Sequence, residues 1–202
     1  MTVVVLAQEG EMRLAGDRWW RFRAVQELWA EEVRFCWRAR FRLFRVEDSY
    51  AGGDGRLDAR LLGLVPIVRA RGPELSVGEA YRYLGELPWV PPAWTRNPAL
   101  EWRELDERTR EVAAAVAGAR AVVRIELDER GDAVSVSAAA RPALEGKGTV
   151  ERPWGGAFAD YRTLGGLRVP ARGEAWWDLP DGRRPYWRGR VTALEVRAGD
   201  AR

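Results

Sequence analysis

Four residues at helical spacing carry the side chains best suited to chemistry: Glu79, Arg82, Tyr83 and Glu86. Side chains three and four positions apart share one helix face, so Arg82 can pair with both carboxylates. An arginine placed in this way suits the carboxylate or phosphate head group of a ligand if the helix closes a pocket. On an exposed helix the same residues would form an ordinary solvated face, and the sequence leaves both interpretations open.

Two tryptophans follow on a segment whose backbone is restricted by proline. Trp89 and Trp94 lie among Pro88, Pro91 and Pro92, and the fixed φ angle of proline can hold the rings in place without support from a strand. Binding sites are concave and mainly apolar, so we predict that Trp89 and Trp94 line a ligand pocket. The alternative is a hydrophobic lid that seals one end of the core.

The composition excludes several kinds of chemistry. The chain has no histidine, one cysteine (Cys36) and one lysine (Lys147). Mechanisms based on Ser-His-Asp or Cys-His are therefore impossible, and a CxxC redox or zinc site cannot form. Lys147 lies in a Gly-Lys-Gly turn without the surrounding pattern of a P-loop. We predict no cofactor and no metal site.

Carboxylate catalysis remains open, because Asp and Glu alone can perform acid and base chemistry when burial separates their pKa values. The candidates are Glu79, Glu86 and Asp160. Their spacing does not single out a catalytic pair. We therefore expect a protein that is not an enzyme.

Charge and its placement argue against nucleic-acid binding. The 33 basic and 30 acidic residues give a net charge of only +3. A basic stripe of Arg34, Arg38, Arg40 and Arg42 alternates with aromatic residues, which places the rings on the opposite face of a strand. A single-strand binding surface needs rings and basic groups on the same face. We predict no nucleic-acid partner.

Alternating apolar and polar residues predict a protein made mainly of β-strands. The clearest strand is 33–43, and short turns separate similar runs on both sides of it. One helix interrupts the pattern. The capping-box spacing of Ser76 and Glu79 predicts its start and Pro88 its end. A longer Gly- and Pro-containing loop is expected at 142–156.

These elements predict a mainly β (α+β) fold with one inserted helix. We expect a large curved antiparallel sheet that forms a half-barrel or barrel around the helix, because a sheet this broad must curl. A single domain over residues 1–202 is the natural reading of the length, with a further segment upstream as an open alternative. The abundant tryptophans, 11 in all, are expected to fill the core of this sheet.

The first residues do not have the pattern of an export signal. The apolar run 3–7 lacks a basic region before it and leads directly into polar residues, and no stretch is long enough to span a membrane. On this basis we expect a cytoplasmic protein. The oligomeric state is left open by the sequence.

Several motifs together resemble a family of uncharacterised bacterial proteins, a domain of unknown function. They are QEGEMR at 8–13, DSY at 48–50, LLGLVP at 61–66, GEAYRYLGELPW at 78–89, FADYRTLGGLRVP at 158–170 and YWRGRVTALEV at 186–196. More distantly, the strand series with its closing hairpin is similar to the lipoprotein-carrier half-barrels of the LolA and LppX kind. That resemblance implies a cupped sheet that holds acyl chains against inserted helices.

The preferred hypothesis is a non-enzymatic binder of a hydrophobic small molecule or lipid-like ligand in the concave face of the sheet. Trp89 and Trp94 would line the mouth of the pocket, and Arg82 would engage a polar head, with Tyr83, Glu79 and Glu86 beside it. Two alternatives remain: an interaction or structural module with a solid tryptophan-rich core, and a carboxylate-dependent enzyme that acts on a hydrophobic substrate.

Overall fold

The computed structural model describes residues 1–14, 16–145 and 148–199, so Lys147 lies outside the described residues. These residues form one antiparallel sheet, one main helix and two short helical turns. The elements are β1 (Thr2–Arg13), β2 (Trp19–Trp29), β3 (Phe35–Arg40), β4 (Phe44–Ala51), β5 (Asp54–Leu61), β6 (Val65–Arg71), α1 (Pro73–Gly85), η1 (Leu87–Trp89), α2 (Ala93–Arg96), β7 (Glu101–Glu104), β8 (Thr109–Val116), β9 (Ala119–Leu127), β10 (Ala133–Glu145), β11 (Gly148–Leu164), β12 (Leu167–Leu179) and β13 (Gly182–Ala198).

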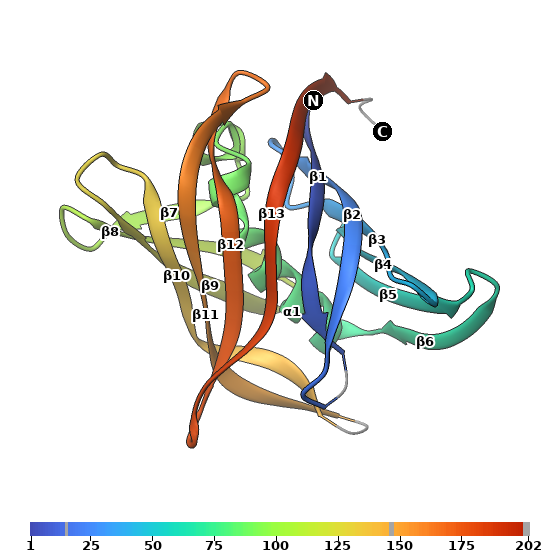
Figure 1. Cartoon of the computed structure of the whole chain (residues 1–202). Coiled ribbons are helices and arrows are strands. Elements are labelled where there is room, and N and C mark those ends of the chain that lie inside the picture. Colours follow the sequence, from blue (N-terminus) through green and yellow to red (C-terminus); the bar gives the residue numbers. More distant parts are fainter. Residues whose placement is uncertain (15, 146–147, 200–202) are drawn as a thin grey trace.

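The first and last strands pair in the middle of the sheet. The strand order in space is β6-β5-β4-β3-β2-β1-β13-β12-β11-β10-β9-β8-β7. The chain therefore builds one arm outward from β1 to the edge strand β6, crosses through α1 to the other edge at β7, and returns strand by strand to β13 (Figure 1). The helical segment thus joins the two edges of the sheet.

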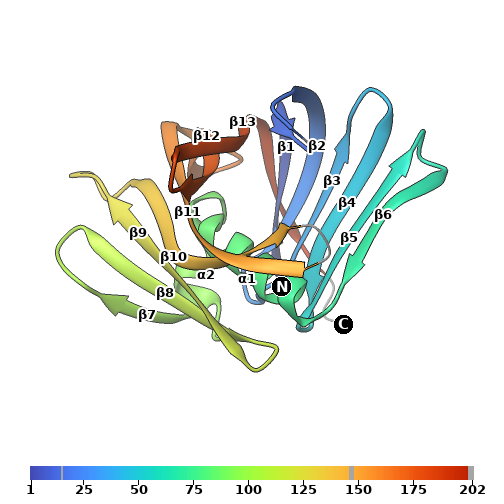
Figure 2. The same ribbon diagram turned by 90° about the horizontal axis from the view of Figure 1, so that it is seen from below.

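The sheet curls into a half-barrel around α1. Seen from below, the two arms rise on either side of the helix, which lies in the concavity between them (Figure 2). The helix contacts β4 and β5 of one arm and β8, β9 and β10 of the other. This confirms the predicted fold class of a curved antiparallel sheet around one inserted helix.

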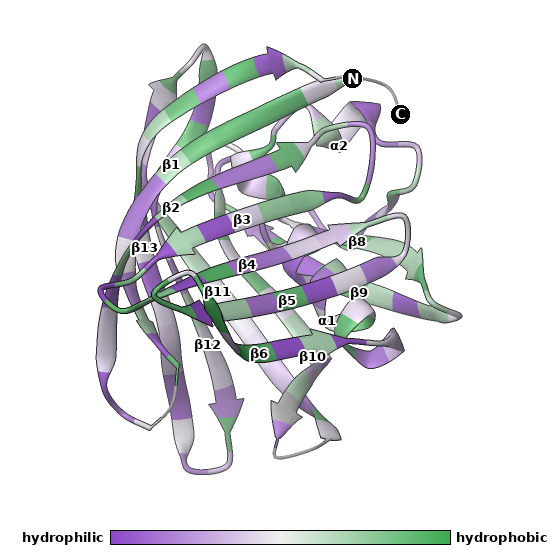
Figure 3. Cartoon of the chain, turned by 90° about the vertical axis from the view of Figure 1, so that its right-hand side faces the viewer, coloured by the Kyte–Doolittle hydropathy of each residue, from purple (hydrophilic) through white to green (hydrophobic). Residues whose placement is uncertain are grey.

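Strand β3 shows why the alternation in sequence indicates which face is buried. Phe35, Trp37 and Ala39 are buried in the hydrophobic core, whereas Arg38 and Arg40 are exposed on the outer face. Successive side chains of a strand point to opposite faces of the sheet, so one face contacts the core and the other water. Figure 3 shows the same mixture of hydrophobic and hydrophilic residues along the other strands of this arm.

The start of the helix differs from the prediction. Helix α1 begins at Pro73, where the missing N–H of proline costs nothing, and no side chain caps it. Ser76 lies one turn inside, where its hydroxyl donates to the carbonyl of Gly72 at 3.0 Å and accepts from the N–H of Gly55 at 2.8 Å. Ser76 therefore ties the helix to β5 and does not form a capping box with Glu79.

One predicted break in the sheet is in fact part of two strands. The expected loop 142–156 belongs to β10 and β11, which pair as far as Glu145 and Gly148. Pro66 lies inside β6, beside a register shift opposite Arg60. Proline is tolerated there because β6 is an edge strand and needs no partner on its outer side.

A row of glycines crosses the centre of the sheet and makes room for aromatic rings. Gly10, Gly189 and Gly173 are cross-strand partners on β1, β13 and β12. A Cβ at Gly173 would lie 2.8 Å from the Trp89 ring, and one at Gly189 would lie 2.9 Å from the Trp187 ring. The missing side chains allow both indoles to pack directly on the backbone of the sheet.

The Gly173→Ala variant should be destabilised by about 1–3 kcal/mol, because the added methyl group must displace the Trp89 ring in a packed core. Gly148→Ala is the matched control, since a Cβ at Gly148 meets nothing within 4 Å. Urea unfolding of both variants measures the difference. Equal midpoints for the two would show that the glycine row does not accommodate the indoles.

Candidate functional site

A cavity of about 360 Å³ lies between α1 and the concave face of the sheet. Helix residues form one wall, and the other walls come from β3, β4 and the strands β10 to β13. The lining includes Trp37, Asp48, Glu79, Arg82, Glu86, Trp89, Arg141, Trp154, Phe158, Ala175, Trp177, Tyr186 and Trp187. A volume in this range, with mainly apolar walls and a few polar groups, is typical of a small-molecule site.

Arg82 is the centre of a buried ion cluster. Its guanidinium donates to Asp48 Oδ2 at 2.5 Å and to Glu86 Oε1 at 3.0 Å, and the three side chains are almost enclosed. The guanidinium also lies over the rings of Phe35 and Trp37, with Cζ 4.7 and 5.1 Å from the ring centroids. The charged face of the helix is thus buried against the sheet and is not a solvated face.

Two buried glutamines extend this cluster across the sheet. Gln26 donates a very short hydrogen bond to Glu86 and accepts one from Gln8 at 2.9 Å. Gln8 in turn accepts from the indole N–H of Trp37 at 3.0 Å. The resulting chain of hydrogen bonds links β1, β2 and β3 to α1. Buried polar networks in which the members are satisfied in this way fix one arrangement of their elements.

Glu79 is the least compensated carboxylate in the cavity. Its side chain is buried, and Oε2 has no hydrogen-bond partner. Burial is the main cause that raises the pKa of Glu79 to about 8; the negative charge of Asp48 adds to it, and Arg82 and Arg141 oppose it. Burial also raises the pKa of Asp48, opposed by Arg82, which donates to it directly. Because Glu79 has no such donor, it is the carboxyl group that holds a proton near neutral pH.

Arg141 forms the opposite polar wall, on β10. Its Nε donates to the carbonyl of Gly78 on the helix at 3.3 Å, and its NH1 donates to the Tyr186 hydroxyl at 3.2 Å. The same hydroxyl accepts from the indole N–H of Trp154 at 2.9 Å. The guanidinium lies over the rings of Trp154 and Trp177, 4.7 and 5.5 Å from their centroids.

Aromatic rings form the remaining walls. Trp89 packs edge-on against Phe158 and Trp187, with centroid separations of 5.2 and 5.8 Å. Trp177 stacks on Tyr186 at 5.8 Å. The indole N–H of Trp89 donates to the carbonyl of Pro170 at 2.9 Å, which fixes its ring against β12. The cavity therefore has polar groups at Arg141 and Glu79 and rigid apolar surfaces around them.

The structure brings together four of the six residues singled out in the sequence. Glu79, Arg82, Glu86 and Trp89 line the cavity. The other two are not among its lining residues. The Tyr83 hydroxyl donates to the carbonyl of Trp29 at 2.7 Å, and Trp94 stacks on Trp102 at 4.8 Å and donates to the carbonyl of Leu87.

The sequence did not identify the polar lining residues Asp48, Arg141 and Tyr186 as part of the site. A weak signal for Arg141 exists, since it is a charged residue within a run of small apolar ones. Of the carboxylates considered for catalysis, Asp160 does not line the cavity and pairs with Arg162 at the surface. Among the described residues, no cluster of three or more Cys, Asp or Glu side chains is arranged to hold a metal ion.

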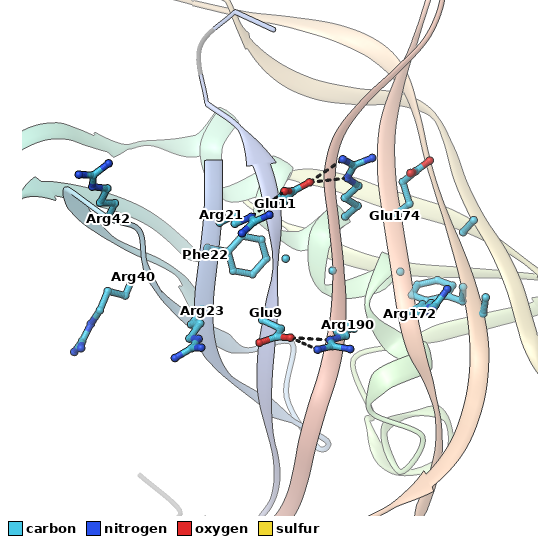
Figure 4. A pocket seen from close by; sticks show the side chains of 17 residues that line it. Glu9, Glu11, Arg21, Phe22, Arg23, Arg40, Arg42, Arg172, Glu174 and Arg190 are labelled. Atoms are coloured by element: carbon cyan, nitrogen blue, oxygen red, sulfur yellow. Dashed lines mark hydrogen bonds and ion pairs between the residues drawn. The ribbon is translucent and has the colours of Figure 1, made fainter. Parts of the chain in front are cut away.

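A second depression, larger and open, lies on the outer face of the sheet. It has a volume of about 950 Å³ and follows the strands on both sides of the β1–β13 pair (Figure 4). Seven arginines and three glutamates line it, so it is positively charged overall, although Arg188 binds Glu11 and Arg190 binds Glu9. We place the candidate site in the smaller cavity because Glu79 and Arg141 are buried there beside aromatic rings.

The chain matches the model of one protein family over most of its length. The model of DUF6544, a family of unknown function, matches residues 1–189. The chain belongs to this family. Among proteins with curated functions, none matches the chain. Membership confirms the resemblance to an uncharacterised family and brings no activity with it.

Solved structures share the fold at low sequence identity. A domain from Vibrio parahaemolyticus, described as an outer membrane lipoprotein-sorting protein, aligns with a TM-score of 0.55 at 13% identity, over 98% of this chain and 87% of its own. A DUF1329 family protein from Desulfovibrio piger aligns at 0.53 and 8% identity, over 99% and 87%. A LolA superfamily protein from Nitrosomonas europaea aligns at 0.48 and 9%, over 98% and 87%. The predicted similarity to lipoprotein-carrier half-barrels is thereby confirmed at the level of the fold.

The expected cytoplasmic location is wrong by this comparison. The Vibrio domain of this fold is described as a lipoprotein-sorting protein of the outer membrane, which conflicts with a cytoplasmic assignment. The sequence argument failed because it relied on the lack of an export signal in the first residues. Within the described residues, no helix is long and apolar enough to cross a membrane.

Replacement of Arg82 by Met should destabilise the fold by about 3–5 kcal/mol, because Asp48 and Glu86 would remain buried without their shared cation. Arg38→Met is the matched control. Arg38 bridges Glu27 and Glu47 at the exposed outer face, where such pairs contribute about 1 kcal/mol or less. Chemical unfolding at neutral pH compares the two variants. Similar losses for both would contradict a central role for Arg82.

Glu79 should make stability depend on pH. Its folded pKa of about 8 exceeds the value of 4.5 for an unperturbed glutamate, so between these values the folded state binds more protons than the unfolded state. Stability should therefore fall relative to Glu79→Gln as pH rises through this window, by about 1.4 kcal/mol for each pH unit. Urea midpoints of both proteins against pH measure this difference. Parallel curves would mean that Glu79 titrates normally.

Proposed function

We propose that the protein binds a hydrophobic, lipid-like ligand in the cavity between α1 and the concave face of the sheet. The observation that carries the proposal is the cavity itself, about 360 Å³ enclosed by Trp37, Trp89, Trp154, Trp177 and Trp187. Rigid aromatic walls offer a large apolar contact area to a ligand and need little reordering when it binds. The lipoprotein sorting named for the Vibrio domain of the same fold supports this class of ligand.

The cavity argues against a purely structural module. A solid core would leave no space of this size, because protein interiors are packed with few voids larger than a water molecule. Several large side chains that line the space are held in place by hydrogen bonds, among them Trp37, Trp89 and Trp154. Ligand binding accounts for an open space among fixed rings better than incomplete packing does.

A carboxylate-dependent enzyme is the second candidate, and Glu79 is the residue that favours it. Its raised pKa and position in the cavity suit a general acid. Acid and base catalysis by carboxylates uses a second group in a different state. Glu86 and Asp48 are both engaged by Arg82, so neither is free to act as that partner. Binding without turnover is therefore the better-supported function.

Native mass spectrometry of protein purified from cells, followed by lipid extraction, tests binding directly. We expect a co-purifying amphiphile, and we expect Ala175→Phe to lower its occupancy about tenfold or more, since 1.4 kcal/mol of lost affinity is enough for that. Ala175 lines the cavity, whereas Ala159 lies on the outer face of β11. Ala159→Phe, the matched control, should keep the ligand. Ligand-free wild-type protein that also binds no added acyl amphiphile would refute the proposal.

A further inference from the structure

Arg141 differs from Arg82 in how its charge is compensated. Arg82 has two carboxylates within 3.0 Å. Arg141 is only 8% exposed, yet its contacts are the neutral oxygens of Gly78 and Tyr186. Within the described part of the chain, no carboxylate oxygen lies within the 4.0 Å of an ion pair with it. A buried guanidinium without a direct counter-ion in an apolar cavity is costly unless another anion pairs with it.

The surroundings of Arg141 are suited to holding an anion. The Tyr186 hydroxyl beside it accepts hydrogen bonds from Arg141 and Trp154, so its own proton remains available for a ligand oxygen. The rings of Trp154 and Trp177 cover the guanidinium and keep it in one orientation. The planar guanidinium can bind two oxygens of a carboxylate or phosphate at once.

Glu79 is a further group in the cavity, and its protonation depends on the charge of a bound ligand. The charged groups that line the cavity around it are Asp48 on β4, Glu74 and Arg82 on α1, Glu86 at the C-cap of α1, Arg141 on β10 and Glu174 on β12. Tyr186 on β13 is the remaining titratable group of the lining that borders Arg141. Glu79 Oε2 is buried without a partner. Glu79 therefore has room to donate or accept one more hydrogen bond inside the cavity.

Resting on the function proposed above, we propose that the ligand is an acyl amphiphile with an anionic oxyacid head, bound by Arg141 and Tyr186, and that it binds only while Glu79 is protonated. With a proton on Glu79, the four charges that act on it, those of Asp48, Glu86, Arg82 and Arg141, cancel. Glu74 and Glu174 add negative charge to the lining. An ionised Glu79 and an anionic head would together add two more negative charges in a low-dielectric space. Each such charge weakens the binding of an anion.

The inference predicts a linkage between binding and pH of a definite sign. The affinity for an anionic amphiphile should be constant below the pKa of Glu79 in the free protein, which is about 8, and should fall at higher pH. For a single linked proton the decrease approaches about tenfold for each pH unit. An uncharged amphiphile of the same chain length should show no such decrease.

Isothermal titration calorimetry with dodecanoate, dodecyl phosphate and dodecanol tests this inference. The titrations cover about pH 6.5 to about pH 9.5, the range in which proton linkage determines how the affinity changes with pH. The two anions distinguish a carboxylate head from a phosphate head. Wild-type protein should bind at least one of them at least about tenfold more tightly than dodecanol at the lower pH, a difference of 1.4 kcal/mol. Glu79→Gln should keep this affinity at the higher pH. Arg141→Gln should bind the anions no better than dodecanol.

The possible outcomes separate the two proposals. If dodecanol and both anions bind equally at every pH, the cavity binds acyl chains and the assignment of Arg141 and Glu79 is wrong. If no probe binds, the proposed function itself fails. A fold lost in Arg141→Gln does not affect the test, because the comparison of the three probes on wild-type protein across pH decides it alone.

Discussion

The ion cluster around Arg82 is the interaction on which the rest of the structure depends. A helix in the concavity of a sheet buries the face that meets the strands, and here Arg82 in the last turn of α1 and its C-cap residue Glu86 face β2, β3 and β4. The cost of removing these charges from water is offset because Asp48 and Gln26 reach them from the strands. A shift of the helix along the sheet would break these contacts. The cluster thereby fixes the distance between α1 and the sheet, and with it the cavity.

The row of glycines on β1, β13 and β12 determines the wall of the cavity that lies opposite the helix. Gly10, Gly189 and Gly173 remove side chains from the centre of the sheet, so that Trp89 and Trp187 pack on its backbone. These indoles then form a rigid wall opposite the helix. Polar contacts on one side and aromatic packing on the other hold the space open. Arg141 and Glu79 lie within that space as polar groups without a direct ionic partner from the fold itself.

The sequence predicted the local structure well and the polar site only in part. The alternation around Phe35 and Trp37 identified a strand and its buried face, because that pattern depends on adjacent residues alone. The four lining residues between Glu79 and Trp89 were found because they share a short segment. Asp48 and Arg141 contact the helix from 34 and 63 positions away in the chain, so no local pattern connects them with it. The capping box failed because Pro73 starts the helix earlier and leaves Ser76 to bond β5.

A crystal structure of the protein with an amphiphile brominated at the end of its chain would test the central claim most directly. The account predicts anomalous bromine density among Trp89, Phe158 and Trp187, with the oxygens of the head group within hydrogen-bond distance of Arg141 and Tyr186. Bromine density confined to the outer depression over β1 and β13 would contradict it. So would a structure in which side chains fill the space between α1 and the sheet.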